Sequence, residues 1–384
     1  MNSKIKSFFQ AMSGLRKYKK IHTINELLDL PNHVKKNYRK VHNVDLSELD
    51  LSKEENMFSG ALPKQFMTTS ECSEQNIILD WTDNVIWPEP DKLPIGINPK
   101  QILQDSKQSP EISKLHAIGL TGKGINIAII DQRLNLTHPE YAKRIKEYKV
   151  FGPWDKKGID YHGSLVAGIS VGKTTGAAPD ANLYYFATPT SEQTEKGTRV
   201  LSRKYVLDAL KQIIEFNKTH SEKDKIRFLS CSWGTKNDLY TAECNELFKE
   251  CEQNGIKIIG GAYKHMKTYP FDARYPNNTD FIGIPTDGKT TSFWQGGYKY
   301  TRQGGSSSTF PYLAGVFACA CQDNQIFFTR PNWQEELTTI LHDTAIESEH
   351  GGKMINPIGI RERVSQIARE MEMNLMKQQS LQNE

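Results

Sequence analysis

Short apolar runs alternate with amphipathic helical patterns from about residue 111 onward, and this alternation constrains the fold more than any other feature of the chain. Helical patterns such as VLSRKYVLDALKQIIEFNK separate the runs. Strands joined by helices of this length form βαβ units, so we predict an α/β fold with a mostly parallel central sheet flanked by helices. The runs are INIAII (125–130), ANLYYFA (181–187), IRFLSCS (226–232), IKIIGGA (256–262) and DFIGI (280–284).

The sequence outside this alternating region differs in character. Residues 1–40 carry ten Lys and Arg against two acidic residues, and proline-rich sequence follows near residues 86–110. We predict an N-terminal helical extension at 1–85, either propeptide-like or regulatory, and a connector at 86–110. The alternative is that the charges of the extension are simply solvated helix faces. The main domain then covers 111–360, and residues 361–384 form a C-terminal helical tail.

Composition excludes several classes of protein. Of the 384 residues, 37% are hydrophobic and 24% are charged, which is enough for a real core. The net charge of +4 is small for this length, so we expect no nucleic-acid partner. No stretch approaches the ~18–20 apolar residues that a membrane span needs, so we expect no membrane association.

The six cysteines and the N-terminus favour a cytoplasmic protein. No C-x-x-C or paired metal-ligand spacing occurs, and most cysteines lie inside apolar stretches, which is typical of reduced thiols in a core. The opening MNSKIKSFFQAMSGL has only a short apolar part and continues into RKYKK rather than into a small-residue cleavage site. We therefore expect no secretory signal and a cytoplasmic location.

Three polar features stand where α/β proteins gather reactive groups, at the carboxyl ends of strands and at helix starts. Asp131 ends the first run, His162 opens a helix of small residues (YHGSLVAGIS), and a serine run precedes an apolar helix (GGSSSTFPYLAG). Each feature by itself has a structural explanation, since Asp is common in turns, a lone His at a helix start is usually structural, and serine runs are usually linkers.

The serine run, however, does not have the surroundings of a linker. A glycine pair supplies a turn before it, and Pro311 with the apolar residues up to Cys321 indicates a helix that begins among the serines. Backbone N–H groups in the first turn of a helix lack intrahelical partners, and the helix dipole favours negative charge there. An acyl-transfer nucleophile needs this environment because its tetrahedral intermediate carries an oxyanion.

Taken in order, the Asp, His and Ser motifs resemble the subtilase family of serine proteases. HGSLVAG (162–168) is similar to the family's H-G-T-H-V-A-G, and GSSSTFPYLAG (305–315) to its G-T-S-M-A-x-P-H-V-A-G. The resemblance runs in register from about 111 to 360 and implies a subtilisin-like peptidase domain there. Further landmarks are GAAPDANLYYFA (176–187), SWG (232–234), ARYP (273–276) and INP (355–357).

The resemblance implies a serine endopeptidase that forms an acyl-enzyme with a peptide or protein substrate. Asp131 would orient and stabilise the imidazole, His162 would act as general base and then acid, and Ser307, four residues before Pro311, would be the nucleophile. Two walls would hold the substrate as an added strand. They comprise Ser232, Trp233, Gly234, Gly260, Gly261 and Ala262.

One departure from the family affects the oxyanion site. Where the family has the asparagine of A-A-A-G-N, this chain reads GGAYK, which places Lys264 there with His265 next. Losing such a donor costs about 10²–10³ in rate. Three interpretations stay open: Lys264 or His265 donates instead, an offset in register hides another donor, or the protein is an impaired pseudoprotease that acts as a peptide-binding or regulatory module.

A second departure concerns metals. The family often has a calcium-binding loop after the histidine helix, but here VGKTTG leads directly into GAAP, so we expect that site to be absent and predict no metal or cofactor. A nucleotide site is also disfavoured, because TGKG precedes its strand instead of following it. The N-terminal extension is a candidate intramolecular inhibitor on its position alone.

Overall fold

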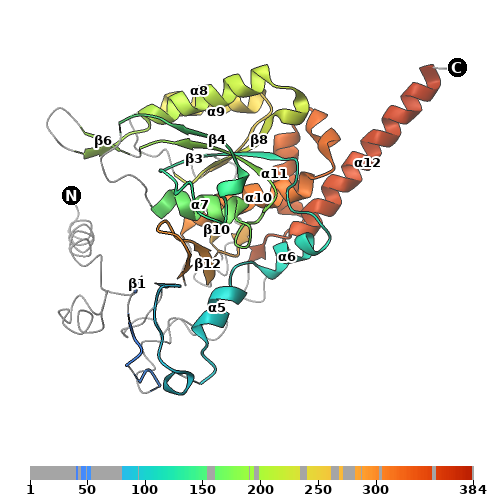
Figure 1. Cartoon of the computed structure of the whole chain (residues 1–384). Coiled ribbons are helices and arrows are strands. Elements are labelled where there is room, and N and C mark those ends of the chain that lie inside the picture. Colours follow the sequence, from blue (N-terminus) through green and yellow to red (C-terminus); the bar gives the residue numbers. More distant parts are fainter. Residues whose placement is uncertain are drawn as a thin grey trace. The chain divides into compact units, whose positions relative to one another are not determined.

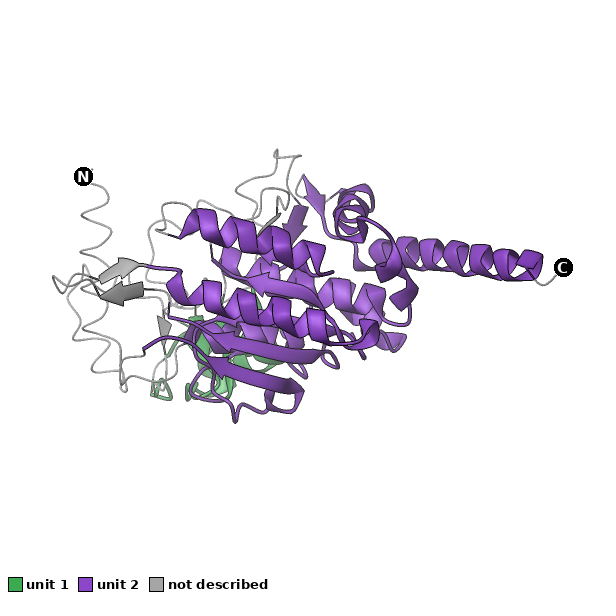
Figure 2. Ribbon diagram, turned by 90° about the horizontal axis from the view of Figure 1, so that it is seen from above, with its two compact units in different colours: residues 1–106, 287–291, 297–303 green, residues 107–286, 292–296, 304–384 purple. Residues whose placement is uncertain are grey.

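The computed structural model describes two compact units, which Figure 2 colours separately. One comprises the chain up to Ser106 with 287–291 and 297–303, and the other comprises 107–286, 292–296 and 304–384. The described residues are 45–48, 50–52, 80–93, 95–153, 161–189, 202–233, 240–260, 282–286, 288–301, 305–347 and 352–382. For residues 40–41, 191–193, 199–201 and 268–270 the structure describes the backbone alone.

The second unit is built on a five-stranded sheet with the order β4-β5-β3-β8-β9, in which neighbouring strands run parallel (Figure 1). This confirms the predicted α/β fold. Four of the strands coincide with predicted apolar runs, whereas the sequence IKEYKV of β4 conceals a strand because it lies at the edge and is only partly buried. The strands are β3 (Asn126–Asp131), β4 (Ile145–Val150), β5 (Asn182–Ala187), β8 (Ile226–Cys231) and β9 (Lys257–Gly260).

Helices cover both faces of this sheet, and successive residues of β3 divide between the two cores. Ile127 and Ile129 pack on one face, and Ala128 and Ile130 on the other. The face with Ile127 is covered by α6 (Pro110–Ala117), α7 (Tyr161–Val171), α10 (Thr309–Cys321), α11 (Trp333–Asp343) and the first half of α12 (Pro357–Gln382). The face with Ala128 is covered by α8 (Lys204–Thr219) and α9 (Thr241–Gln253).

Small residues bring α10 close to its neighbours. Every residue of α10 is buried, which suits its apolar sequence TFPYLAGVFACAC. A Cβ added to Gly315 would lie 2.6 Å from Ala177 Cβ and 3.1 Å from Ser170 O, so the helix can pack here only because residue 315 lacks a side chain. Gly168 of α7 likewise faces Ser292, whose hydroxyl would overlap a Cβ at that position.

Short strands form two further pairings in the second unit. The described part of the apolar run at 280–284 forms a strand, β11. It pairs in parallel with β10 and β15 in a separate sheet of order β10-β11-β15-β14, so it is not part of the central sheet. β6 and β7 form an antiparallel pair. The bounds are β6 (Ser191–Gln193), β7 (Arg199–Leu201), β10 (Thr268–Pro270), β11 (Ile282–Ile284), β14 (Ile346–Glu347) and β15 (Lys353–Met354).

The first unit has its own sheet, of order β1-β2-β13-β12, around an aromatic core. Buried Trp81 stacks on Tyr300 with ring centroids 4.3 Å apart, and Lys299 pairs with Asp80 at 3.1 Å. We predicted a helical extension over residues 1–85, and most of these residues lie outside those that the structure describes. The described parts of this range contribute the strands β1 and β2. The elements are β1 (Lys40–Val41), β2 (Asp80–Thr82), α5 (Pro99–Asp105), β12 (Lys289–Ser292), of which Ser292 belongs to the second unit, and β13 (Tyr298–Thr301).

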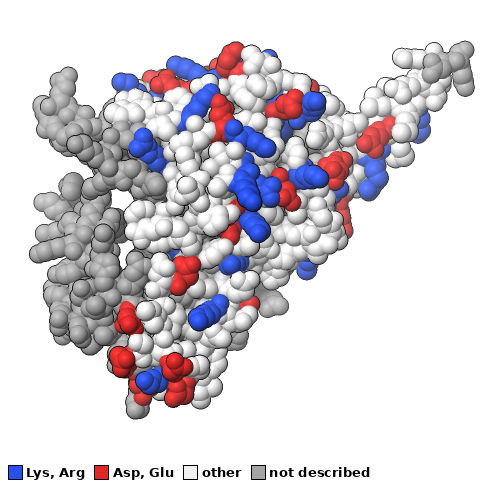
Figure 3. Space-filling model, in the orientation of Figure 1, with Lys and Arg blue, Asp and Glu red and all other residues white. Residues whose placement is uncertain are grey.

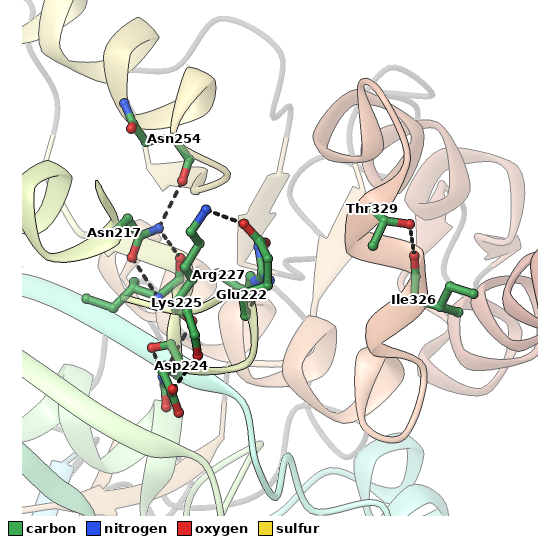
Figure 4. Close-up of polar contacts among 11 residues, drawn as sticks. Asn217, Glu222, Asp224, Lys225, Arg227, Asn254, Ile326 and Thr329 are labelled. Carbon is green, nitrogen blue, oxygen red and sulfur yellow. Dashed lines mark hydrogen bonds and ion pairs between the residues drawn. The ribbon is translucent and has the colours of Figure 1, made fainter. Parts of the chain in front are cut away.

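Buried Asn217 joins three elements at the start of β8 (Figure 4). Its Nδ2 donates to Ile226 O at 2.9 Å and to Asn254 O at 3.0 Å, and its Oδ1 accepts from Ile226 N–H at 2.8 Å. One side chain therefore ties the end of α8 to the first residue of β8 and to the C-cap of α9. At that cap, Gly255 adopts a φ of +75°, as expected of the Asn-Gly helix stop in the sequence.

Charges of both signs are mixed on the described surface. In Figure 3, Lys and Arg lie among Asp and Glu over the face shown. Several form exposed pairs, such as Lys218 with Glu250 at 2.9 Å and Lys249 with Glu246 at 2.7 Å, and such pairs contribute at most about 1 kcal/mol each.

Two expectations about burial can be compared with the described residues. None of the described helices is both long and apolar enough to cross a membrane. The five cysteines that the structure describes are all buried free thiols, as their apolar surroundings predicted, while Cys72 lies outside the described residues.

Candidate active site

Asp131 and His162 meet at the carboxyl end of the central sheet. Asp131 is the last residue of β3 and is 3% exposed, and its Oδ1 lies 2.7 Å from His162 Nδ1 and accepts the Gln132 N–H at 2.7 Å. A carboxylate oxygen accepts, so this contact assigns the donor role to Nδ1–H, and in that tautomer of the imidazole the lone pair lies on Nε2. The sequence singled out both residues as candidates, and the structure places them in contact.

The approach of α7 to this strand end depends on Gly163. A Cβ there would overlap Gln132 O and lie 2.7 Å from the Tyr185 hydroxyl, which itself donates to Gln132 O at 2.5 Å. The next residue, Ser164, is buried and accepts from the Tyr141 hydroxyl at 2.8 Å. Burial raises the pKa of Tyr141 well above its usual value, so this phenol stays a donor.

Ser307 lies in a short 3-10 helix, η7 (Ser306–Ser308), that continues directly into α10 and contacts α7. The helix predicted to begin among the serines is therefore present. Ser306 is exposed, Ser308 is buried, and Ser307 is partly buried. Of the three, Ser307 is bonded to the strand end: its Oγ donates to Ser232 O at 3.3 Å, and Ser232 Oγ donates to Ser307 O at 2.8 Å.

The described residues of the predicted substrate walls lie at the carboxyl ends of two strands of the sheet. Ser232 and Trp233 follow β8, and Gly260 ends β9, where a Cβ would come within 2.8 Å of Cys231 O. The Trp233 indole packs inward, 6.0 Å from the ring of Phe248, and its N–H donates to Ile130 O at 3.3 Å. The remaining predicted residues, Gly234, Gly261, Ala262, Lys264 and His265, lie outside the described residues.

Glu140, which the sequence did not single out, closes the turn after α7. Its buried carboxylate accepts the backbone N–H groups of Thr174 and Thr175 at 2.7 and 3.2 Å, together with the Thr174 hydroxyl at 2.7 Å. The sequence signal for the role of Glu140 was the motif HPEY at 138–141. A Glu that is buried beside His and Tyr needs hydrogen-bond donors for its carboxylate.

Among the described residues no cluster of three or more His, Cys, Asp or Glu side chains could hold a metal ion.

The TGKG loop before β3 has its backbone donors occupied. The N–H groups of Thr121, Gly122 and Lys123 all donate to Gln322 Oε1, at 2.9, 2.9 and 3.1 Å. Gln322 follows the last residue of α10, so this side chain joins that helix to the loop. A phosphate would have to displace the side-chain oxygen of Gln322 from these N–H groups. This agrees with the sequence-based argument against a nucleotide site in the TGKG loop.

Comparison with known proteins identifies relatives of this domain. Residues 122–266 match the subtilase family. The subtilisin-like protease PopC of Myxococcus xanthus (strain DK1622) is 32% identical over 88 residues, which cover 20% of this chain and 18% of PopC. The chain thus aligns with less than a fifth of that relative's length.

The solved structures that resemble this chain have low sequence identity to it. The prenylagaramide maturation protease PagA gives a TM-score of 0.49 at 16% identity, over 67% of this chain and 99% of its own. The PatG macrocyclase domain gives 0.49 at 17%, over 66% and 95%. A cold adapted subtilisin-like serine proteinase gives 0.43 at 18%, over 62% and 89%. The matched span includes both Asp131 and His162, so this region of the chain is similar to the subtilase family.

Proposed function

We propose that this chain is a serine endopeptidase that hydrolyses peptide bonds through an acyl-enzyme. The observation that carries the proposal is the 2.7 Å contact between buried Asp131 and His162 Nδ1, with Ser307 on the adjacent η7. The similarity of residues 122–266 to the subtilase family and the likeness to PopC, a subtilisin-like protease, support the same reaction class.

In the proposed mechanism His162 moves one proton in each half-reaction. Ser307 Oγ attacks the substrate carbonyl carbon while His162 Nε2 takes the hydroxyl proton. The tetrahedral intermediate then collapses: the C–N bond breaks, and His162 gives that proton to the leaving amine, which leaves an ester on Ser307. Water attacks this ester with His162 again as base, and the acid product departs as Ser307 regains its proton. Asp131 stabilises the imidazolium in both halves.

The oxyanion and the substrate need further groups. The Ser307 N–H stands in the first turn of a helix, where donors lack intrahelical partners, and we assign the second donor to Lys264 or His265. Ser232, Trp233 and Gly234 with Gly260, Gly261 and Ala262 would bind an extended peptide through backbone hydrogen bonds. Lys264→Met and His265→Ala variants, measured singly, identify which side chain acts as the donor.

A fluorophosphonate probe tests the assignment of the nucleophile. Wild type should label, and Ser307→Ala and His162→Ala should not. Ser306→Ala and Ser308→Ala are matched controls, because they remove hydroxyls one residue to either side, and both should still label. Folded wild type that resists the probe would favour the alternative, a pseudoprotease that binds peptides or regulates.

The N-terminal extension is proposed to inhibit the peptidase intramolecularly. A site for a sequence-specific protease, inserted within residues 53–79, allows the intact chain to be cut after purification. Activity on a fluorogenic peptide should rise after cutting, and it should not rise in a chain without the inserted site. Equal activity before and after cutting, with the head removed by gel filtration, would contradict this role.

A further inference from the structure

The register of β3 differs on its two sides. With β5 the pairing extends to Asp131 and Ala187, whereas with β8 it ends at Ile129 and Ser230. The last two residues of β3 therefore lie beyond its pairing with β8. On that side the Trp233 indole N–H donates to Ile130 O, one residue before Asp131. A side chain thus supplies a hydrogen bond to the strand end where the backbone pairing with β8 has stopped.

The Trp233 indole is itself held by two other elements. It lies against Phe248 of α9, and the Arg203 guanidinium carbon lies 4.6 Å from the centre of its ring. Arg203 is 7% exposed, and its carbonyl accepts the N–H of Val206 at 2.9 Å in the first turn of α8. A cation over an indole face is attracted most strongly where water is excluded, so burial of Arg203 strengthens this contact.

The residue before Trp233, Ser232, contacts the turn that carries Ser307. Ser232 exchanges two hydrogen bonds with Ser307, at 2.8 and 3.3 Å. Two consecutive residues therefore bond the strand that carries Asp131 and the turn that carries Ser307. Displacement of reacting groups by about 1 Å lowers the rate on the order of 100-fold. The contacts that fix residues 232 and 233 therefore control the geometry between Asp131 and Ser307.

We propose that Arg203 and Trp233 are positioning residues: together they fix the Asp131–His162 pair relative to Ser307. The proposal rests on the proposed peptidase function. It differs from a role for Trp233 as a wall of the substrate site, because the indole N–H and ring face are engaged by Ile130 and Arg203. A wall would govern substrate affinity and preference, whereas a positioning residue governs the rate of the bound complex.

Steady-state kinetics of the full chain separate these roles. Trp233→Phe keeps a ring for Arg203 and removes the N–H donor, and Arg203→Met keeps bulk and removes the cation. Each should lower kcat by about tenfold with KM changed less than twofold, and Arg203→Lys should recover part of kcat. The double variant should lose no more than about the larger single loss, since both act through one contact. A change confined to KM would overturn the proposal.

The chain offers matched controls at the opposite end of β8. Arg227 is 6% exposed, and its guanidinium carbon also lies 4.6 Å from a ring centre, that of Phe328. Trp333 packs on the same Phe328. Arg227→Met and Trp333→Phe should lower stability without lowering kcat. An equal loss of kcat in Arg227→Met and Arg203→Met would show a general loss of folding and contradict the proposal.

A measurement independent of turnover distinguishes failure of this proposal from failure of the peptidase function. The low-field proton NMR signal of His162 Nδ1–H reports its hydrogen bond to Asp131. It should shift or broaden in Trp233→Phe and Arg203→Met and stay unchanged in both controls. An inactive wild type that shows this pattern would refute the peptidase function alone, and an unchanged signal in all variants would refute the positioning role.

Discussion

Ser232 and Ser307 each donate a hydroxyl hydrogen bond to the backbone carbonyl of the other. The contact from Ser232 is the shorter, 2.8 Å against 3.3 Å, so the stronger of the two fixes the backbone of the turn rather than the hydroxyl of Ser307. In the proposed mechanism that hydroxyl must turn from Ser232 O to His162 Nε2. A long, weak bond in the resting state makes this change of partner inexpensive.

Ser232→Ala removes the shorter bond and leaves Ser307 O without that donor. One such bond contributes about 1 kcal/mol, so the rate of fluorophosphonate labelling should fall about fivefold. Ser230→Ala is the control: this hydroxyl lies two residues earlier in β8, is buried, and has no hydrogen-bond partner among the described residues. It should label at the wild-type rate. Equal rates in wild type and Ser232→Ala would show that the contact does not hold the turn.

Asp131→Asn tests the tautomer of His162. An amide at this position can present a donor to Nδ1, which favours the imidazole with its lone pair on Nδ1 and its proton on Nε2. His162 then cannot accept the proton of Ser307, and kcat/KM for a peptide should fall by about 10⁴. Thermal unfolding should change little, since the substitution preserves shape. A loss below tenfold would contradict the role of the carboxylate.

The central sheet could be predicted, and the three candidate residues could be singled out, because their signals are local. β3 and β8 are buried on both faces, so their sequences are continuous apolar runs, and Asp131 ends such a run. His162 and Ser307 stand within motifs of small residues and glycine, whose spacing indicates close helix packing. β4 was not predicted because it is only partly buried and its sequence IKEYKV carries charged residues, as is common in edge strands, so it contains no continuous apolar run.

Contacts between distant residues could not be predicted from one sequence. Periodicity assigns a residue to a face but does not say which residue it meets across that face. The hydrogen bond from Trp233 to Ile130 joins residues 103 positions apart, and that from Thr174 to Glu140 joins residues 34 positions apart. The placement of β11 outside the central sheet also depends on which strand it pairs with, and its apolar sequence suits either sheet.

Glu140→Ala removes the acceptor of the turn after α7 and leaves buried N–H groups of Thr174 and Thr175 unpaired. The free energy of unfolding in urea should fall by about 2–4 kcal/mol, since bonds to a charged group are worth about 1.5–3 kcal/mol each and partly compensate one another. Glu246→Ala, at an exposed pair with Lys249, should cost less than about 1 kcal/mol.

The same measurement, repeated with EDTA, tests the expectation that no calcium site follows α7. The turn there is closed by protein hydrogen bonds to Glu140. Chelation should therefore leave the urea midpoint of wild type unchanged. A midpoint that falls with EDTA and recovers with added Ca²⁺ would contradict this expectation.

Lys257 makes the stability of the second unit depend on pH. Its ammonium, on the first residue of β9, donates to Gln334 O and to Thr338 Oγ1 of α11, both at 2.6 Å. Burial lowers the pKa of Lys257 from 10.5 to about 8, because a charged form deprived of water is disfavoured. Below pH 8 both states hold the proton. Between about pH 8 and 10.5 the unfolded chain binds more protons, so stability rises with pH across this window.

Lys257→Met removes this titration. The free energy of unfolding is measured in urea for wild type and for the variant. The value for wild type minus that for the variant should increase as the pH is raised from 7 to 10, whatever its value at pH 7. A wild-type advantage that is flat or declining with pH would show that Lys257 remains charged in the folded protein, held by Gln334 and Thr338.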